Sequence, residues 1–125
     1  RGRLLAAYDD SQGVTAAFNR NVLKVLNNEL GGDFDPQLFE HRAVWDETNE
    51  WIEMRLRSTV AQRVFLKELD LDLHFAAGEE LRTEISAKFT SERLRVDLAR
   101  GGFVSEMAWT DSSGDFLLTL ARLTR

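Results

Sequence analysis

The chain has 125 residues, of which 43% are hydrophobic and 30% charged, a balance typical of a folded globular protein. Its 16 basic and 21 acidic residues give a net charge of −5, which argues against nucleic-acid binding because proteins that bind a phosphate backbone carry a basic face. The sequence has no cysteine, which excludes disulfides, thiolate metal sites and cysteine nucleophiles and is compatible with a cytoplasmic location.

No apolar run approaches the ~20 residues that a membrane-spanning helix requires, so we expect a soluble protein with no membrane partner. The chain opens RGRLLAAYDD, without an initiator methionine, and this opening already looks helical. We therefore expect the chain to be a piece of a longer protein.

Residues 14–30 predict the longest helix. Their apolar residues recur at intervals of three and four, and glycines lie before and after the segment as end signals. The predicted apolar face consists of Val14, Phe18, Val22, Val25, Leu26 and Leu30. Just beyond this helix, Asp35 followed by Pro36 predicts a short helical turn capped by the aspartate.

After His41 the helical period gives way to alternation, which is typical of antiparallel strands. The segments RAVWD, NEWIEMRLRS, QRVFLKEL and LDLHF are separated by short polar joints, and a meander of hairpins is the simplest topology for them. A further strand, RTEISAKF at residues 82–89, follows a glycine turn. The expected class is α+β, an amphipathic helix with an antiparallel meander.

Alternation along residues 82–89 places two sets of side chains on opposite faces. The first set is Arg82, Glu84, Ser86 and Lys88, and the second is Thr83, Ile85, Ala87 and Phe89. From the pattern alone, the first face is a solvated face on which Glu84 pairs with Arg82 or Lys88.

The last part of the chain predicts a helix and a hairpin. Thr90 or Ser91 is a cap for a short helix that ends at Gly101, and FVSEMAWTD and DFLLTLARL are strands joined by the turn SSG. A helix followed by such a hairpin is a usual close of a Rossmann-like methyltransferase sheet, although many α+β domains end in the same way. We expect these apolar strands to pair with something that the chain lacks.

Few residues suggest chemistry by themselves. His41 and His74 lie 33 positions apart with no second ligand at metal-like spacing, so we expect no metal site, with His41 at the surface or an edge and His74 half-buried. Tyr8 is the only tyrosine and is either a core-edge residue or a phenol donor for a ligand carboxylate. Met54 is by default a core residue. Phosphate-binding and hydrolase motifs are missing, and no catalytic residue is predicted.

Four segments point to a known family. They are AYDDSQGVTAAFNRNVL at residues 7–23, WIEMRLRS at 51–58, FAAGEELRTEISAKF at 75–89 and AWTDSSGDFLLTLA at 108–121. In this order and spacing they resemble the C-terminal part of the histidine-specific, S-adenosylmethionine (SAM)-dependent methyltransferases, the family that includes the L-histidine Nα-methyltransferase of ergothioneine biosynthesis. The resemblance runs essentially from end to end.

The resemblance implies a two-part enzyme. Residues 1–86 are similar to the later part of its substrate-recognition insert domain, and residues 87–125 to the closing helix and β-hairpin of its Rossmann-like class I methyltransferase domain. The half that binds the cofactor SAM is expected to lie outside this chain, so no cofactor-binding residue is assigned here. The implied reaction trimethylates the α-amine of L-histidine to hercynine, and the isolated piece is expected to be inactive.

Five substrate-binding residues carry over from the family. Tyr8 matches a tyrosine that donates to the substrate carboxylate, and Glu84 and Ser86 match a pair that recognises the imidazole ring. A carboxylate can accept from one ring N–H while a hydroxyl satisfies the other nitrogen. Met54 matches a methionine beside the ring, and Thr15 matches a threonine near the amine that acts through water.

Two alternatives remain open at this point. The chain can belong to a methyltransferase of the same family that acts on another amino acid or a dipeptide, although Glu84, Ser86 and Met54 favour histidine. It can also be a non-catalytic binding or interaction domain. Under the leading interpretation the partner is the small molecule L-histidine, with no nucleic acid and no membrane, and the full-length enzyme is a cytoplasmic monomer.

Overall fold

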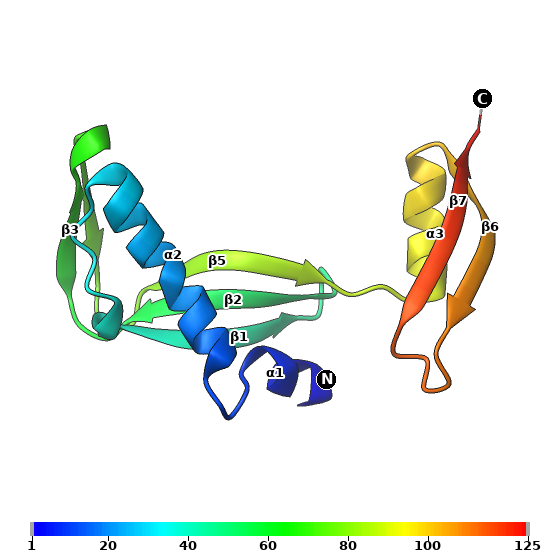
Figure 1. Cartoon of the computed structure of the whole chain (residues 1–125), viewed down its shortest axis with the longest axis horizontal. Helices are drawn as coiled ribbons and strands as arrows, with labels where there is room; N and C mark the ends of the chain where they lie inside the picture. Colours follow the sequence, from blue (N-terminus) through cyan, green and yellow to red (C-terminus); the bar gives the residue numbers. More distant parts are fainter. Residues whose placement is uncertain (1, 125) are drawn as a thin grey trace. The chain divides into compact units, whose positions relative to one another are not determined.

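The computed structural model describes residues 2–124 of the chain. By their contacts the residues form two compact units, which we call unit 1 (Arg1–Ala87) and unit 2 (Lys88–Arg125) (Figure 1). Helices and antiparallel strands occur in both units, as the α+β prediction required. Each unit is described by itself.

Two helices open unit 1. Helix α1 spans Gly2–Tyr8, and helix α2 spans Val14–Leu30 as the period predicted. Helix α2 ends at Gly31, which has the left-handed φ of 58° and donates its N–H to the carbonyl of Asn27. A side chain is disfavoured at this backbone angle, which explains the glycine end signal.

The buried face of α2 differs from the predicted one. Leu23 is fully buried and Asn19 is 3% exposed, whereas Val14 and Phe18, both assigned to the apolar face, are 63% and 66% exposed. Val25, also assigned to that face, is exposed as well. The other three predicted residues, Val22, Leu26 and Leu30, do pack against the core. The predicted face was therefore wrong only in part, because the buried stripe also includes Asn19, whose amide is satisfied by hydrogen bonds inside unit 1.

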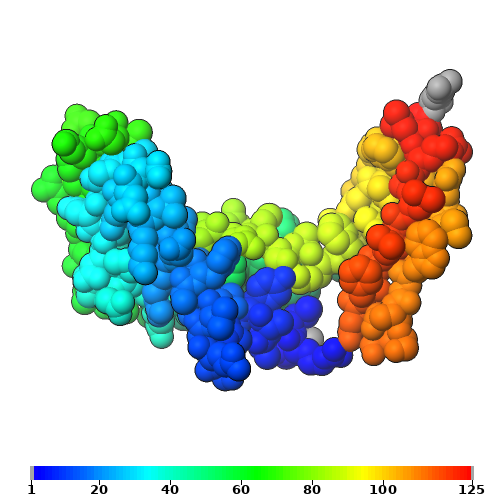
Figure 2. Space-filling model, in the orientation of Figure 1, coloured from blue at the N-terminus to red at the C-terminus, as the bar shows by residue number. Residues whose placement is uncertain are grey.

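Three strands form the main sheet of unit 1: β1 (Phe39–Asp46), β2 (Trp51–Ser58) and β5 (Glu80–Ala87), in the order β1-β2-β5 and antiparallel throughout. Strands β3 (Gln62–Leu66) and β4 (Leu71–Phe75) form a separate hairpin. The strands are therefore antiparallel as predicted, but β2 pairs with β5 and not with β3, so their order is not that of a simple meander. Helix α2 lies over the three-stranded sheet (Figure 2).

Two 3₁₀ turns complete unit 1. The first, η1, spans Pro36–Leu38, and the Asp35 side chain accepts from the backbone N–H of Gln37 at 2.9 Å, which confirms the predicted cap. The second, η2, spans Lys67–Leu69 between β3 and β4.

The core of unit 1 lies where α2, the main sheet and the β3–β4 hairpin meet. Its buried apolar residues are Leu23, Phe34, Phe39, Leu56, Val64 and Leu66. Phe39 packs edge-on against Phe34 and against Phe75, with ring centroids 5.8 Å and 5.4 Å apart. This packing holds the far end of α2 against the hairpin and leaves its first turns beside β5.

A bulge interrupts the pairing of β2 with β5. Met54 is opposite Glu84 but Arg55 is opposite Arg82, so Thr83 is an extra residue on β5. The predicted common face of Arg82, Glu84 and Ser86 was therefore wrong at Arg82. The side chain of Arg82 pairs with Glu53 on the other face of the sheet, while Thr83 and Glu84 both lie on the face that α2 covers.

Unit 2 consists of helix α3 (Ser91–Arg100) and the antiparallel hairpin β6 (Phe103–Thr110) and β7 (Leu117–Leu123). Thr90 caps α3 by accepting from the N–H of Arg93 at 3.1 Å, as predicted. The face of the hairpin away from α3 carries exposed apolar side chains: Val104, Met107, Trp109, Leu118 and Leu120. Within residues 2–124, no helix is both long and apolar enough to cross a membrane.

Candidate functional site

Unit 1 carries all five predicted substrate-binding residues. Tyr8 is the last residue of α1, Thr15 lies in the first turn of α2, and Met54 is on β2. Glu84 and Ser86 are both on β5, beyond the bulge. Two helix ends, the central strand β2 and the edge strand β5 therefore position these side chains.

Tyr8 and Ser86 are in direct contact. Their hydroxyl oxygens are 2.7 Å apart, and either can donate. The two residues are 78 positions apart in the sequence, so this hydrogen bond joins the end of α1 to β5. The structure thus brings together the residue predicted to bind a carboxylate and one of the two predicted to bind a ring.

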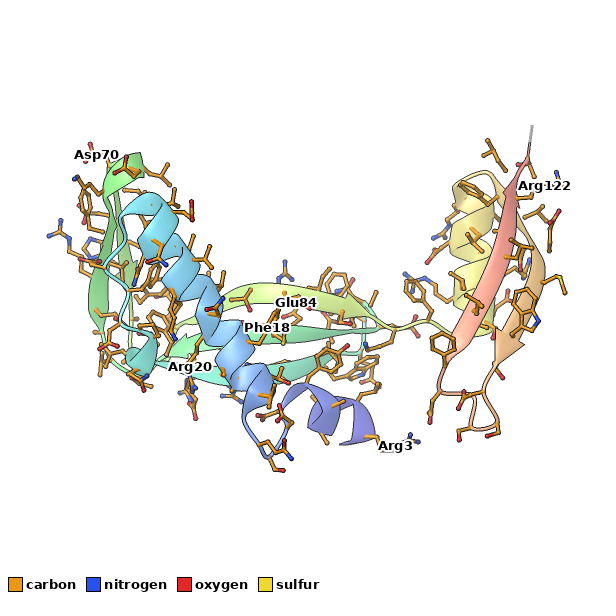
Figure 3. The ribbon with its side chains drawn as sticks, in the orientation of Figure 1. Arg3, Phe18, Arg20, Asp70, Glu84 and Arg122 are labelled. Atoms are coloured by element: carbon orange, nitrogen blue, oxygen red, sulfur yellow. The ribbon has the colours of Figure 1, made fainter. Side chains whose placement is uncertain are left out.

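Glu84 borders a hollow between α2 and β5. The hollow has a volume of about 210 Å³ and is lined by Phe18, Asn19, Asn21, Val22, Thr83 and Glu84. Figure 3 shows Glu84 on β5 beside Phe18 on α2. Within residues 2–124, no hydrogen bond or ion pair engages the Glu84 carboxylate, so its predicted pairing with Arg82 or Lys88 does not form. A carboxylate in this setting is available to accept an N–H from a ligand.

Met54 lies beside Glu84 on the same face of the sheet. The two residues are directly opposite each other across β2 and β5, and Met54 is only 4% exposed. Ser86 is opposite Ile52, which is fully buried. Glu84 and Ser86 on β5 therefore lie next to buried apolar residues of β2. Ile85, by contrast, is 45% exposed and does not provide support behind β5.

Thr15 is engaged by Asp10 at the start of α2. The carboxylate of Asp10 accepts from the backbone N–H of Thr15 at 2.8 Å and from that of Val14 at 3.0 Å, which satisfies two otherwise unpaired donors of the first helical turn. Hydrogen bonds from the backbone and the hydroxyl of Thr15 lower the pKa of Asp10 to about 2. Asp10 is consequently an anion at neutral pH and fixes the chain segment that connects Tyr8 to Thr15.

A buried network of hydrogen bonds, which the sequence analysis did not predict, connects α2, β1 and β5 next to the five predicted residues. Asn19 donates through Nδ2 to His41 Nδ1 at 2.9 Å and to the carbonyl of Arg55 at 3.1 Å, and its Oδ1 accepts from the Thr83 hydroxyl at 2.6 Å. His41 Nε2 donates to the backbone carbonyl of Tyr8 at 2.8 Å. The available signal was the position of Asn19, four residues before Leu23 and so on the same face of α2. A polar residue on a buried face requires hydrogen-bond partners from other elements.

The predicted burial of the two histidines was reversed. His41 is 7% exposed within this network, and His74 is exposed on β4. His74 shares its face of β4 with Asp72, opposite the half-buried Leu73 and Phe75, so alternation along LDLHF places His74 toward solvent.

Charged residues hold the opposite face of the main sheet. Glu53 is 3% exposed and accepts from Arg55 Nε at 2.8 Å, from Arg82 Nη1 at 2.9 Å and from the Trp51 indole at 3.0 Å. The hydrogen bonds from Arg55, followed by those from Arg82 and Trp51, lower the pKa of Glu53 in spite of its burial. This cluster joins β2 to β5 on both sides of the bulge.

No glycine-rich turn of the kind that binds SAM lies between a strand and an α-helix of the described residues. In Rossmann-like sheets the donor's nucleotide binds at a glycine-rich turn that leads from a strand into a helix. Within residues 2–124 the one strand followed by an α-helix is β5, and residues 88–90 between β5 and α3 contain no glycine. Residues 2–124 also include no cluster of three or more His, Asp or Glu side chains that could hold a metal ion.

Comparison with known proteins identifies the family. The sequence profile of the histidine-specific, SAM-dependent methyltransferases matches residues 1–123. The chain is 55% identical over 120 residues to histidine N-alpha-methyltransferase of Mycolicibacterium smegmatis (strain ATCC 700084 / mc(2)155), covering 96% of this chain and 37% of that protein. It is 51% identical over 119 residues to histidine N-alpha-methyltransferase of Mycobacterium tuberculosis (strain CDC 1551 / Oshkosh), covering 95% of this chain and 37% of that protein. The chain, which spans 37% of the length of these relatives, belongs to the histidine-specific, SAM-dependent methyltransferase family.

Proposed function

We propose that the protein carrying this chain methylates the α-amine of L-histidine with SAM, and that unit 1 contributes the histidine-binding residues. The observation that carries the proposal is the arrangement of β5. Glu84 presents a carboxylate without a partner among residues 2–124 at the rim of a hollow, and Ser86 on the same strand bonds to Tyr8. The full reaction proposed is trimethylation to hercynine, a step of ergothioneine biosynthesis, in the cytoplasm.

The imidazole ring is the part of histidine that the two β5 residues recognise. Residues two apart on a strand are separated by roughly 6.5 Å along one face, which suits contact with the two nitrogens of a ring held between them. Glu84 accepts one ring N–H, and the hydroxyl of Ser86 satisfies the other nitrogen. Met54, opposite Glu84, supplies a polarisable apolar contact for the ring.

Tyr8 binds the carboxylate of the substrate. A phenol is a neutral donor and brings no charge of its own that must be desolvated. The Tyr8 hydroxyl has one proton, which it can donate either to Ser86 or to the substrate. To donate to the substrate, Tyr8 must accept from the Ser86 hydroxyl, or the Tyr8–Ser86 hydrogen bond must break. Thr15 contributes near the amine through water.

Under this proposal, other parts of the protein bind the methyl donor SAM. Unit 2 supplies the closing helix and hairpin of the methyltransferase sheet, and the part that binds SAM lies outside the described residues. What residues 2–87 do is bind and orient histidine so that its amine faces the methyl donor, and positioning of this kind is a large part of catalysis by enzymes that join two substrates.

Steady-state methylation assays on the full-length protein test the proposal. With SAM and a panel of single amino acids and histidine-containing dipeptides, we expect methylated histidine as the main product, detected by mass spectrometry. Methylation of another amino acid in preference to histidine contradicts the substrate and supports a sister enzyme of the same family. Binding of histidine with no methylation of any amino acid supports a non-catalytic binding protein.

A further inference from the structure

We propose that Asn19, His41 and Thr83 are positioning residues for histidine binding, acting through a buried relay of hydrogen bonds that connects the backbone of Tyr8 to the β5 bulge next to Glu84. The inference rests on the proposed function above and extends it to three residues that do not touch the substrate. The relay runs from the Tyr8 carbonyl through His41 and Asn19 to the Thr83 hydroxyl.

The direction of every bond in the relay follows from its two ends. A backbone carbonyl can only accept, so His41 Nε2 carries the proton that it donates to Tyr8, and Asn19 Nδ2 faces the carbonyl of Arg55. The second N–H of Asn19 then points at His41 Nδ1, which accepts as the unprotonated nitrogen of a neutral ring. Asn19 Oδ1 is left to accept from Thr83.

The relay is buried, and it leaves no polar atom without a partner. Asn19 is 3% exposed and His41 is 7% exposed, and within residues 2–124 every buried side-chain nitrogen and oxygen has a hydrogen-bond partner. Buried networks that are fully satisfied hold their members in one arrangement, because any other arrangement leaves a group unpaired in a low-dielectric interior. Asn19 and His41 are therefore in a position to fix geometry.

One end of the relay holds Tyr8. The carbonyl of Tyr8 belongs to the last turn of α1, where backbone carbonyls lack intrahelical donors, and His41 supplies the missing donor at 2.8 Å. The hydroxyl of the same residue is bonded to Ser86. Tyr8 is thus held at its backbone by the relay and at its side chain by β5.

The other end holds the bulge. The hydroxyl of Thr83, the extra residue on β5, lies 2.6 Å from Asn19 Oδ1 and 2.9 Å from the carbonyl of Met54. The bulge determines the face on which Glu84 lies, because a strand without it would place Glu84 on the same face as Arg82. By tying Thr83 to α2, the relay keeps Glu84 beside the hollow.

Two substitutions at one position separate the functions of the relay. In His41→Asn the new side-chain oxygen takes the place of Nδ1 and still accepts from Asn19, but the donor to Tyr8 is lost. In His41→Gln the new amide nitrogen takes the place of Nε2 and still donates to Tyr8. His74→Gln is the matched control, since His74 is the other histidine and lies exposed on β4.

The test measures KM and kcat of the full-length enzyme for histidine and for SAM, with thermal unfolding as the check on folding. We expect His41→Asn to raise KM for histidine about tenfold with little change in kcat or in KM for SAM, a size within the range for residues of one bonded network. His41→Gln is expected to restore most of the affinity, and His74→Gln to match the wild type. Equal effects of His41→Asn and His41→Gln overturn the proposal.

A double-mutant cycle with Tyr8→Phe gives the second readout. If His41 acts by positioning the Tyr8 hydroxyl, the effect of His41→Asn on KM for histidine shrinks severalfold when that hydroxyl is already absent. An undiminished effect in the Tyr8→Phe background shows that His41 acts only on general stability and overturns the inference. Failure of the proposed function is distinct, because the wild-type enzyme then does not methylate histidine at all.

Discussion

The hydroxyl of Tyr8 lies 2.7 Å from the hydroxyl of Ser86, which joins the end of the first helix to the last strand of unit 1. This bond places the proposed donor to the substrate carboxylate next to the hydroxyl proposed to bind the imidazole ring. It also makes the two roles separable by experiment, because each can be removed by a single substitution.

Tyr8→Phe removes the proposed donor to the substrate carboxylate. We expect KM for histidine to rise about tenfold, since a hydrogen bond to a charged group contributes about 1.5 to 3 kcal/mol. The sharper measurement compares histidine with its carboxyl methyl ester. The preference of the wild-type enzyme for the free acid is expected to shrink in Tyr8→Phe, and an unchanged preference assigns carboxylate binding to another residue.

Asp10 is expected to titrate well below an ordinary aspartate. Its folded-state pKa of about 2 lies under the unfolded value of 3.8, so the stability it contributes is present above about pH 4 and is lost as the pH falls through about 2. Carbon-13 NMR of the side-chain carboxyl during an acid titration measures the midpoint.

Thr15→Val supplies the control for this titration. It removes the hydroxyl that bonds to Asp10 and keeps the backbone N–H, so the midpoint is expected to move up toward 3.8 without reaching it. A midpoint near 3.8 in the wild-type chain contradicts the capping geometry.

Glu53→Gln tests the charged cluster on the other face of the main sheet. Glutamine keeps the shape but removes the charge that accepts from Arg55 and Arg82, so we expect the free energy of unfolding to fall by about 1 to 3 kcal/mol. Urea denaturation followed by circular dichroism measures the change.

Asp72→Asn is the matched control for that change. Its partner Arg63 has a side chain that is 63% exposed and that of Asp72 is 42% exposed, so breaking this solvent-screened pair is expected to lower stability much less than Glu53→Gln. Equal losses in the two variants indicate that Glu53 is no more important than a surface ion pair.

Local patterns predicted the elements of the fold better than their pairing. Helix α2, the Asp35 turn, the Thr90 cap and the final hairpin follow from spacing and end signals that depend on neighbouring residues only. The pairing of β2 with β5 across the intervening β3–β4 hairpin depends on contacts between distant residues, and alternation carries no information about which strands are neighbours.

The residues proposed for the site come from family resemblance, and their geometry did not follow from the sequence pattern. Family resemblance indicated Glu84 and Ser86, yet strict alternation also placed Arg82 on their face. One extra residue, Thr83, reverses that assignment, and a bulge has no signal in a pattern of polar and apolar residues. Similarly, hydrophobic spacing alone could not predict that Asn19 is buried, since its burial depends on partners that other elements supply.

The most direct test of histidine recognition is kcat/KM for histidine in Glu84→Ala of the full-length enzyme, with Glu29→Ala as the control because Glu29 is exposed near the far end of α2. Loss of a charged acceptor that bonds the ring N–H is expected to lower kcat/KM by about tenfold or more, while Glu29→Ala retains the wild-type value. An unchanged kcat/KM in Glu84→Ala contradicts the assignment of Glu84 to the imidazole ring.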